Sequence, residues 1–241
     1  VDVNAGGSLQ ADGSALADLA AVTLNGTGNL TLTGAEVIGS LASGSGTSTV
    51  TLNGNTLTTG GNDTSTTFAG VIDSAGGLTK TGTGTMTLTG ANTFTGATAV
   101  NGGALAVTGS GALASIAVQV SAGTLTTDSD ALASGAVVTV SGTGTFNSSD
   151  DDSYAGITQT GGTIGGSGVQ TLSGAFTQSG GTTAGTVHIN AATFTQSGGA
   201  TVAAGTTVTS TGVQGLQGGS VAGALDGAGT ITVSTGTTTV T

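Results

Sequence analysis

Residues 78–107 read LTKTGTGTMTLTGANTFTGATAVNGGALAV, and their alternation decides the fold class. In the stretch 85–89, Met86 and Leu88 fall on one side of an extended strand and the threonines fall on the other. Threonine suits the outward side because it is a polar residue that favours extended backbone. Gly102 and Gly103 then supply the conformations of a tight corner. The stretch predicts short strands with Thr outside, Met, Leu, Phe and Val inside, and glycine corners.

The same alternation recurs along the whole chain. It predicts an inner side made of Leu30/Leu32, Val50/Leu52, Leu105/Val107, Ile116/Val118/Val120, Val138/Val140 and Ile231/Val233. The related phrases are GTGNLTLTG at 26–34, GTGTMTLTG at 82–90, GSGTSTVTLNG at 44–54, GTGTFNSS at 142–149 and GAGTITVSTG at 227–236. Helical periodicity is confined to SALADLAA at 14–21, which we expect to form a short helix or a cap over an open end.

A second phrase sets the length of one repeat. TQTGG begins at Thr158 and TQSGG begins at Thr177 and again at Thr195, so the spacings are 19 and 18 residues. A period of about 20 residues is typical of one turn of a solenoid. A single turn cannot bury enough apolar surface to fold alone, so the turns must stack on one another. We expect residues 1–241 to form one all-β domain, a parallel β-solenoid of about twelve rungs, with 157–200 containing rungs of 18–19 residues.

Composition excludes several classes of protein. Charged residues make up only 5% of the chain, the net charge is −11, and a single residue is Lys or Arg. Such a chain cannot neutralise a run of phosphates, so we expect no nucleic-acid partner. It also lacks a polybasic patch and any apolar run long enough for a spanning helix, so we expect no direct membrane insertion. A hydrophobic fraction of 36% argues against disorder.

The span 67–113 resembles a known bacterial repeat. FAGVIDSAGGLTKTGTGTMTLTGANTFTG, followed by ATAVNGGALAVTGSGAL, is similar to the passenger-associated transport repeat of autotransporters. The resemblance implies a right-handed parallel β-helix that a Gram-negative bacterium exports to its surface or beyond. It implies no catalytic residue and no cofactor.

Acidic residues concentrate in NSSDDDSY at 147–154. Asp150, Asp151 and Asp152 are candidate Ca²⁺ ligands because calcium takes six to eight oxygens, but adjacent residues rarely all point at one ion. A run of like charges is more often a solvated loop tip, and we favour that interpretation. Tyr154, directly after the run, is expected to be exposed and to offer a surface contact.

Catalytic arrangements have little support in the sequence. His188 lies between Val187 and Ile189, so it should point to solvent if its neighbours point inward, and no nucleophile elbow accompanies it. Asp73, Asp128 and Asp226 are the acidic residues that a polysaccharide-cleaving site could use, but nothing places two of them on one face. We therefore expect a protein that is not an enzyme.

The threonine pairs indicate contacts spread over an outer surface and not a single binding or catalytic site. The residues Thr31, Thr33, Thr85, Thr87 and Thr89 are candidate surface contacts, because Thr-x-Thr puts two hydroxyls on one outer face. Such pairs resemble those of some ice-binding proteins, although here they recur at irregular intervals and threonine is also simply a good outward strand residue.

These observations favour an extracellular structural or adhesive solenoid that acts at the cell surface or in the matrix. Its expected partners are copies of itself or components of the cell surface or matrix. A fibre subunit stacking end to end is the alternative, because open strand edges are templates for pairing and the last strands, within 230–241, are expected to end uncapped. An ice-binding protein and a polysaccharide-cleaving β-helix rank below these.

Overall fold

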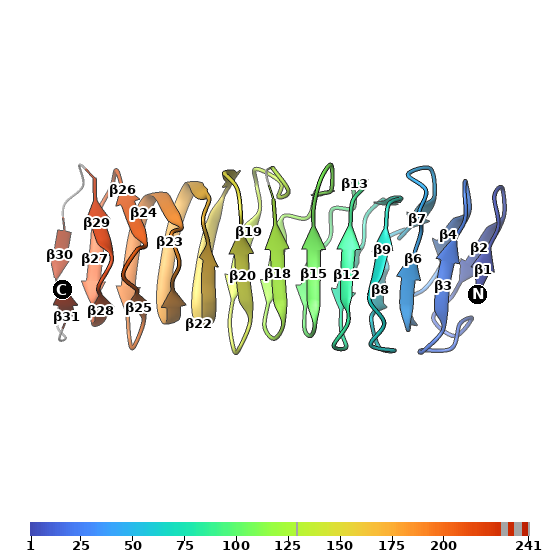
Figure 1. Ribbon diagram of the computed structural model, residues 1–241, viewed down its shortest axis with the longest axis horizontal. Coiled ribbons are helices and arrows are strands. Elements are labelled where there is room, and N and C mark those ends of the chain that lie inside the picture. The colour runs from blue at the N-terminus through green and yellow to red at the C-terminus, as the bar shows by residue number, and fades with distance from the viewer. Residues whose placement is uncertain (129, 228–230, 234–237, 241) are drawn as a thin grey trace.

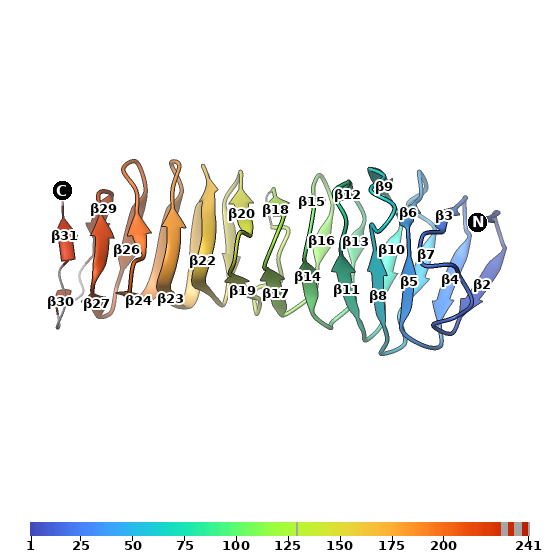
Figure 2. The same cartoon turned by 90° about the horizontal axis from the view of Figure 1, so that it is seen from below.

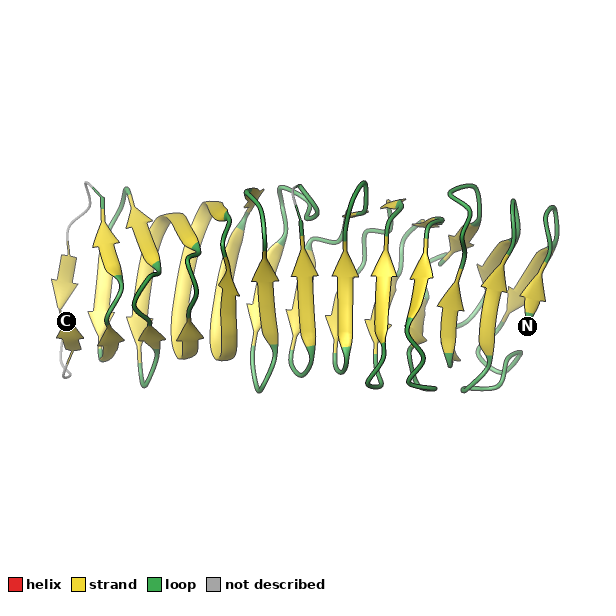
Figure 3. Ribbon diagram, viewed as in Figure 1, coloured by secondary structure: helices red, strands yellow, loops and turns green. Residues whose placement is uncertain are grey.

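The computed structural model describes residues 1–128, 130–227, 231–233 and 238–240, with side chains described as far as residue 227. The chain winds into a rod of about 11 turns, with the two termini at opposite ends (Figure 1). The described residues contain strands and loops but no helix (Figure 3). The expectation of an all-β parallel β-solenoid is confirmed, with about 11 turns in place of twelve rungs.

Each full turn contributes strands to three faces, and equivalent strands of successive turns pair in parallel. The first face consists of β5 (Glu36–Ile38), β8 (Thr56–Thr59), β11 (Gly77–Lys80), β14 (Thr98–Val100), β17 (Ala117–Val120), β19 (Val137–Val140), the first part of β22 (Gly156–Gly166), the middle of β23 (Val169–Thr183), the second half of β24 (His188–Ser197), β27 (Gln214–Gln217) and β30 (Ile231–Val233).

The second face consists of β1 (Asp2–Val3), β3 (Ala21–Leu24), β6 (Ser40–Ala42), β9 (Thr66–Phe68), β12 (Thr85–Leu88), β15 (Ala104–Val107), β18 (Thr124–Thr127), β20 (Thr145–Ser148), the last parts of β22 and β23, β25 (Thr201–Val202), β28 (Gly219–Val221) and β31 (Thr238–Val240).

The third face consists of β2 (Ser8–Ala11), β4 (Asn29–Leu32), β7 (Thr49–Thr51), β10 (Val71–Asp73), β13 (Ala91–Asn92), β16 (Ala112–Leu113), β21 (Asp152–Tyr154), the first parts of β23 and β24, β26 (Thr207–Ser210) and β29 (Ala224–Asp226). The view from below shows strands of this face, such as β10, β13 and β16, beside those of the first face (Figure 2).

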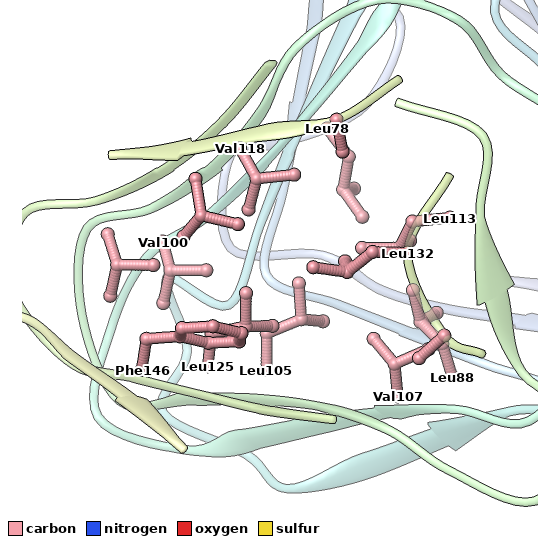
Figure 4. Close-up of a cluster of buried hydrophobic side chains, with 14 of the residues drawn as sticks. Leu78, Leu88, Val100, Leu105, Val107, Leu113, Val118, Leu125, Leu132 and Phe146 are labelled. Carbon is pink, nitrogen blue, oxygen red and sulfur yellow. The ribbon is translucent and has the colours of Figure 1, made fainter. Parts of the chain in front are cut away.

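The core is a set of apolar columns that run along the rod. On the second face Met86, Leu105, Leu125 and Phe146 are in register, one above the other, and each is at most 2% exposed. Figure 4 shows Leu105, Leu125 and Phe146 meeting Leu78 and Val118 from the first face and Leu113 and Leu132 from the third. Burying one such side chain stabilises the fold by about 1.5–3 kcal/mol, so each turn depends on its neighbours to cover its apolar layer.

The expected inner pairs lie inside, with one error. Side chains of Leu30/Leu32, Val50/Leu52, Leu105/Val107, Val118/Val120 and Val138/Val140 are fully buried, whereas those of Ile231 and Val233 lie outside the described side chains. Ile116 is 61% exposed, so its assignment to the inner side was wrong. The strand begins only at Ala117, and the corner before it is held by Ser115, whose hydroxyl donates to Gly96 O (2.6 Å) and Ala117 O (3.0 Å). The alternation therefore starts after Ile116.

The segment 14–21 is not a helix. Residues 14–20 belong to an irregular connection between β2 and β3, and Ala21 begins β3. The connection starts with a turn in which Ser14 donates to Asp12 Oδ1. The connection lies along β5, because Gly13 N–H donates to Glu36 Oε2 (2.9 Å) and Ala20 O accepts from Gly39 N–H (2.8 Å). Eight residues are too few for a stable isolated helix, and contacts with β5 decide the conformation instead.

Glycine is required where corners of successive turns touch. Gly103 has a φ of 57°, and a Cβ there would meet the backbone of Gly84 and Gly82 in the turn before it. Side chains at this corner would separate the turns and break the parallel ladder, so the glycine-rich corners are a direct consequence of stacking.

Candidate functional surface

The threonines singled out in the sequence lie on the outer surface but on two different faces. Thr85 and Thr87 are half-buried and point outward from β12, and Thr89 follows that strand. Thr31 and Thr33 lie on and just after β4 of the third face, and their hydroxyls are already bonded, to Asn29 Oδ1 (2.7 Å) and Ala11 O (3.3 Å). The structure does not bring these five residues together into one patch.

Stacking instead creates threonine ladders that the sequence spacing hides. On the second face the outward residues Thr124, Thr145, Thr163, Thr182 and Thr201 are in register in five successive turns. On the first face Thr139, Thr158, Thr177 and Thr195 form a second ladder. The intervals look irregular in the sequence because the corners differ in length, whereas in space neighbouring hydroxyls are one strand apart, about 4.8 Å. In the sequence, the repeated phrases TQTGG and TQSGG were the one signal from which the first-face ladder could have been predicted.

The acidic run does not behave as a uniform loop tip. Asp150 and Asp151 are exposed, as expected, and Asp151 Oδ1 accepts a hydrogen bond from Val169 N–H (2.9 Å). Asp152 begins β21, is only 3% exposed, and has one carboxylate oxygen without a hydrogen-bond partner. Burial raises the pKa of Asp152 to about 6, and the negative charges of Asp130 and Asp128 add to that rise. In the described part of the chain no group of three acidic or histidine side chains is arranged to hold a metal ion.

Tyr154 is a core residue, so the expectation of an exposed contact was wrong. The ring is 1% exposed and packs edge-on against Phe146, with ring centroids 6.3 Å apart. Its hydroxyl donates to Gln170 Oε1 (2.9 Å), and burial raises the pKa of the phenol well above its usual value. The reason is strand alternation: Asp152 and Tyr154 both point inward, and Ser153 between them points outward.

The interior also holds a glutamine ladder that sequence reading missed. The side chains of Gln159, Gln178 and Gln196 are fully buried and in register. Gln178 Nε2 donates to Gln159 Oε1 (3.0 Å), and Gln196 Nε2 donates to Gln178 Oε1 (3.4 Å). Thr183 Oγ1 donates to Gln159 Oε1 (3.1 Å). An unbonded buried amide costs free energy, and among the side-chain polar atoms of these three glutamines only Gln196 Oε1 lacks a partner, so the hydrogen bonds favour a single register of the three turns.

Lys80 is buried as well. It lies in the same column of inward residues as Gln159, Gln178 and Gln196, several turns closer to the N-terminus. Its Nζ donates to Thr81 O (2.5 Å) and more distantly to Gly82 O and Gly102 O (both 3.5 Å). Burial lowers the pKa of Lys80, and the negative charge of Asp63 opposes part of that shift. The ammonium group therefore holds carbonyls of two successive corners together.

Residues weighed for catalysis are dispersed. His188 is exposed on the third face, and Val187 and Ile189 on either side of it are buried, as expected. Asp73 and Asp226 share the third face but are separated by several turns, and Asp128 lies at a corner. At about 4.8 Å for each turn, that separation far exceeds the ~5–10 Å between paired catalytic carboxylates. No pocket is found over the residues that the structure describes.

Two segments match the passenger-associated-transport-repeat family: residues 78–107 and residues 165–183. The first runs from β11 into β15 and covers about one and a half turns, within the span 67–113 where the resemblance was seen. The second runs from the end of β22 through β23, and sequence reading had recognised there only the TQSGG phrase. No curated protein and no solved structure matches the chain.

The molecule is thus a parallel β-solenoid with two segments that match the passenger-associated transport repeat. This chain is an autotransporter passenger-like β-helix. None of its described residues forms a helix long and apolar enough to cross a membrane.

Proposed function

We propose that the chain is an extracellular, non-enzymatic rod that acts at the surface of a Gram-negative bacterium or in its matrix, as an adhesive or spacing element. The observation that carries this proposal is the combination of two transport repeats with a rod whose outer strand faces are lined mainly by Thr, Ser, Asn, Ala and Gly. Many weak contacts along such faces suit attachment to an extended surface better than recognition of one small molecule. Its partners are then surface or matrix components or further copies, with neither nucleic acid nor lipid among them.

Attachment is tested with the purified chain on a quartz-crystal microbalance. The sensors carry bacterial matrix polysaccharide or collagen, and bare silica serves as the control. Retention on one of the biological coatings, above retention on silica and above that of an unrelated protein of equal net charge, supports the proposal. Equal retention on every sensor contradicts it. Release of reducing ends from the polysaccharide during the same incubation would contradict the non-enzymatic part.

A fibre subunit is the second candidate, and one observation favours it. Equivalent strands of successive turns pair in parallel along the described rod, and the same pairing between the end turns of two rods would continue the stack. A parallel edge is a template for a further strand. Electron microscopy across a concentration series tests this: fibres that lengthen with concentration support end-to-end stacking, and rods of constant length contradict it. The expectation that the last strands, within 230–241, end uncapped falls partly on residues 230, 234–237 and 241, which lie outside the described residues.

A further inference from the structure

Charge is distributed unevenly around the rod. From β8 to β28 the outward side chains of the strands on the first and second faces are all uncharged, and none is larger than glutamine. The exposed carboxylates lie in turns, such as Asp63, Asp130 and Asp150, or on the third face, as Asp226 does. A chain with a net charge of −11 therefore presents two flat, neutral faces. Because these faces offer no charge to pair with, we expect a partner that binds along them to be uncharged as well.

The second face carries the longest hydroxyl ladder. In Figure 1 its strands β12, β15, β18 and β20 lie side by side along the front of the rod. The five hydroxyls of Thr124, Thr145, Thr163, Thr182 and Thr201 are half-exposed, and within the described residues none of them makes a hydrogen bond to the protein. Beside Thr163, Thr182 and Thr201 run the small residues Gly165, Ala184 and Ala203, whereas Thr126 and Asn147 stand beside Thr124 and Thr145. Little therefore projects above the ladder in the last three of its five turns. The hydroxyls are spaced about 4.8 Å apart and need partners outside the chain.

The chemistry of this face selects among neutral, periodic partners. Proteins usually bind crystalline polysaccharide by stacking sugar rings on exposed aromatic side chains. This surface has no such side chain to offer, because every aromatic residue is buried: Phe68, Phe94, Phe146, Phe176, Phe194 and Tyr154. Ordered water needs only hydroxyls and methyl groups at a regular spacing, and threonine supplies one of each. Water bridging is nearly as favourable as a direct hydrogen bond, and hydroxyls in register at a regular spacing offer a row of sites for such waters.

We propose that the threonine ladder of the second face binds ice. The rigid register of five turns holds a row of waters at the ladder spacing, and the row continues into the crystal. Each contact is weak, and their number on one rigid face makes adsorption persistent. This inference is independent of the adhesive function, because a neutral water-binding face and a surface partner on another face can coexist.

The strand β23 provides matched variants, because it presents Thr171 on the third face and Thr182 on the second. The test variant is Thr163→Lys with Thr182→Lys, and the control is Thr171→Lys with Thr209→Lys on the third face. Each protein is checked by circular dichroism and then measured for thermal hysteresis and for adsorption to an ice shell. We expect the natural chain and the control to adsorb and to show hysteresis, and the test variant to fall to the level of buffer.

Three outcomes would overturn the proposal. The natural chain could show neither hysteresis nor ice adsorption. Both double variants could lose activity equally, which would remove the second face from the explanation. Sedimentation with crystalline cellulose, lost in the test variant, in the absence of ice adsorption would assign the face to polysaccharide.

Discussion

Replacing Asp152 by asparagine should change how the stability of the rod depends on pH. The carboxylate is 3% exposed, one of its oxygens is unbonded, and the other accepts a hydrogen bond from Ser153 N–H (3.0 Å). The titratable groups near it are the carboxylates of Asp128 and Asp130 and the neutral phenol of Tyr154, two residues further along the strand, and none is a cation. Ionisation of Asp152 in the folded chain therefore opposes burial and two like charges.

The sign and size follow from linkage. The pKa is raised from 3.8 when unfolded to about 6 when folded, so the folded state holds its proton more tightly. The stabilisation is complete below about pH 4 and is lost as the pH rises through about 6. A shift of this size corresponds to about 3 kcal/mol as an upper limit. Asp152→Asn should match the natural chain at pH 4 and be more stable at pH 7.5 by about 1–3 kcal/mol, since the amide keeps the shape without the charge.

The assay is thermal unfolding between pH 3.5 and 8, with hydrogen exchange of the peptides that cover β21 and β23. The matched control is Asp150→Asn, because that side chain is exposed in the same run. The control should retain the pH dependence of the natural chain. An Asp152→Asn protein that loses stability between pH 4 and pH 6.5 as steeply as the natural chain would refute the reasoning.

Substitutions of Gln178, Lys80 and Gly103 test the interior and the corners. Gln178→Ala should destabilise by about 2–4 kcal/mol, because it leaves a cavity and unbonded polar atoms in the ladder, and Gln178→Leu, which fills the space, should cost less in urea unfolding. Lys80→Met should lower the free energy of unfolding by about 1–3 kcal/mol, because the carbonyls of Thr81 and Gly102 lose their donor. Gly103→Ala should lower the midpoint of thermal unfolding, because φ is positive and the corner below is in contact, whereas Gly44→Ala, where a Cβ meets nothing within 4 Å, should leave it unchanged.

Period-2 alternation was enough to predict the fold class and most of the core. It identified Met86, Leu88 and Phe94 from sequence because their neighbours are threonines with a clear outward preference. It failed at Ile116, where the strand begins one residue later, and at 14–21, where eight residues were assigned by local pattern although their contacts are with β5. Boundaries of this kind depend on the neighbouring turn, which the local sequence does not contain.

The acidic run shows how a strong compositional signal can hide a strand. Three consecutive aspartates are typical of a solvated tip, and that interpretation holds for Asp150 and Asp151. The strand begins at Asp152, so the alternation that governs the rest of the chain turns Asp152 and Tyr154 inward. Register with Gln170 and Leu172 in the next turn decides this, and it becomes visible only when the turns are stacked.

The threonine ladder of the first face and the buried glutamines both depend on the register of the same strands. Thr158, Thr177 and Thr195 immediately precede Gln159, Gln178 and Gln196, so each pair points to opposite sides of one strand. The turns contain 19 and 18 residues, and apolar side chains alone would tolerate a small slip between turns of unequal length. Buried amides do not tolerate a slip, because it would leave them unbonded. The glutamine ladder therefore fixes the register of these turns, and the outward threonines of the first face are aligned as a consequence.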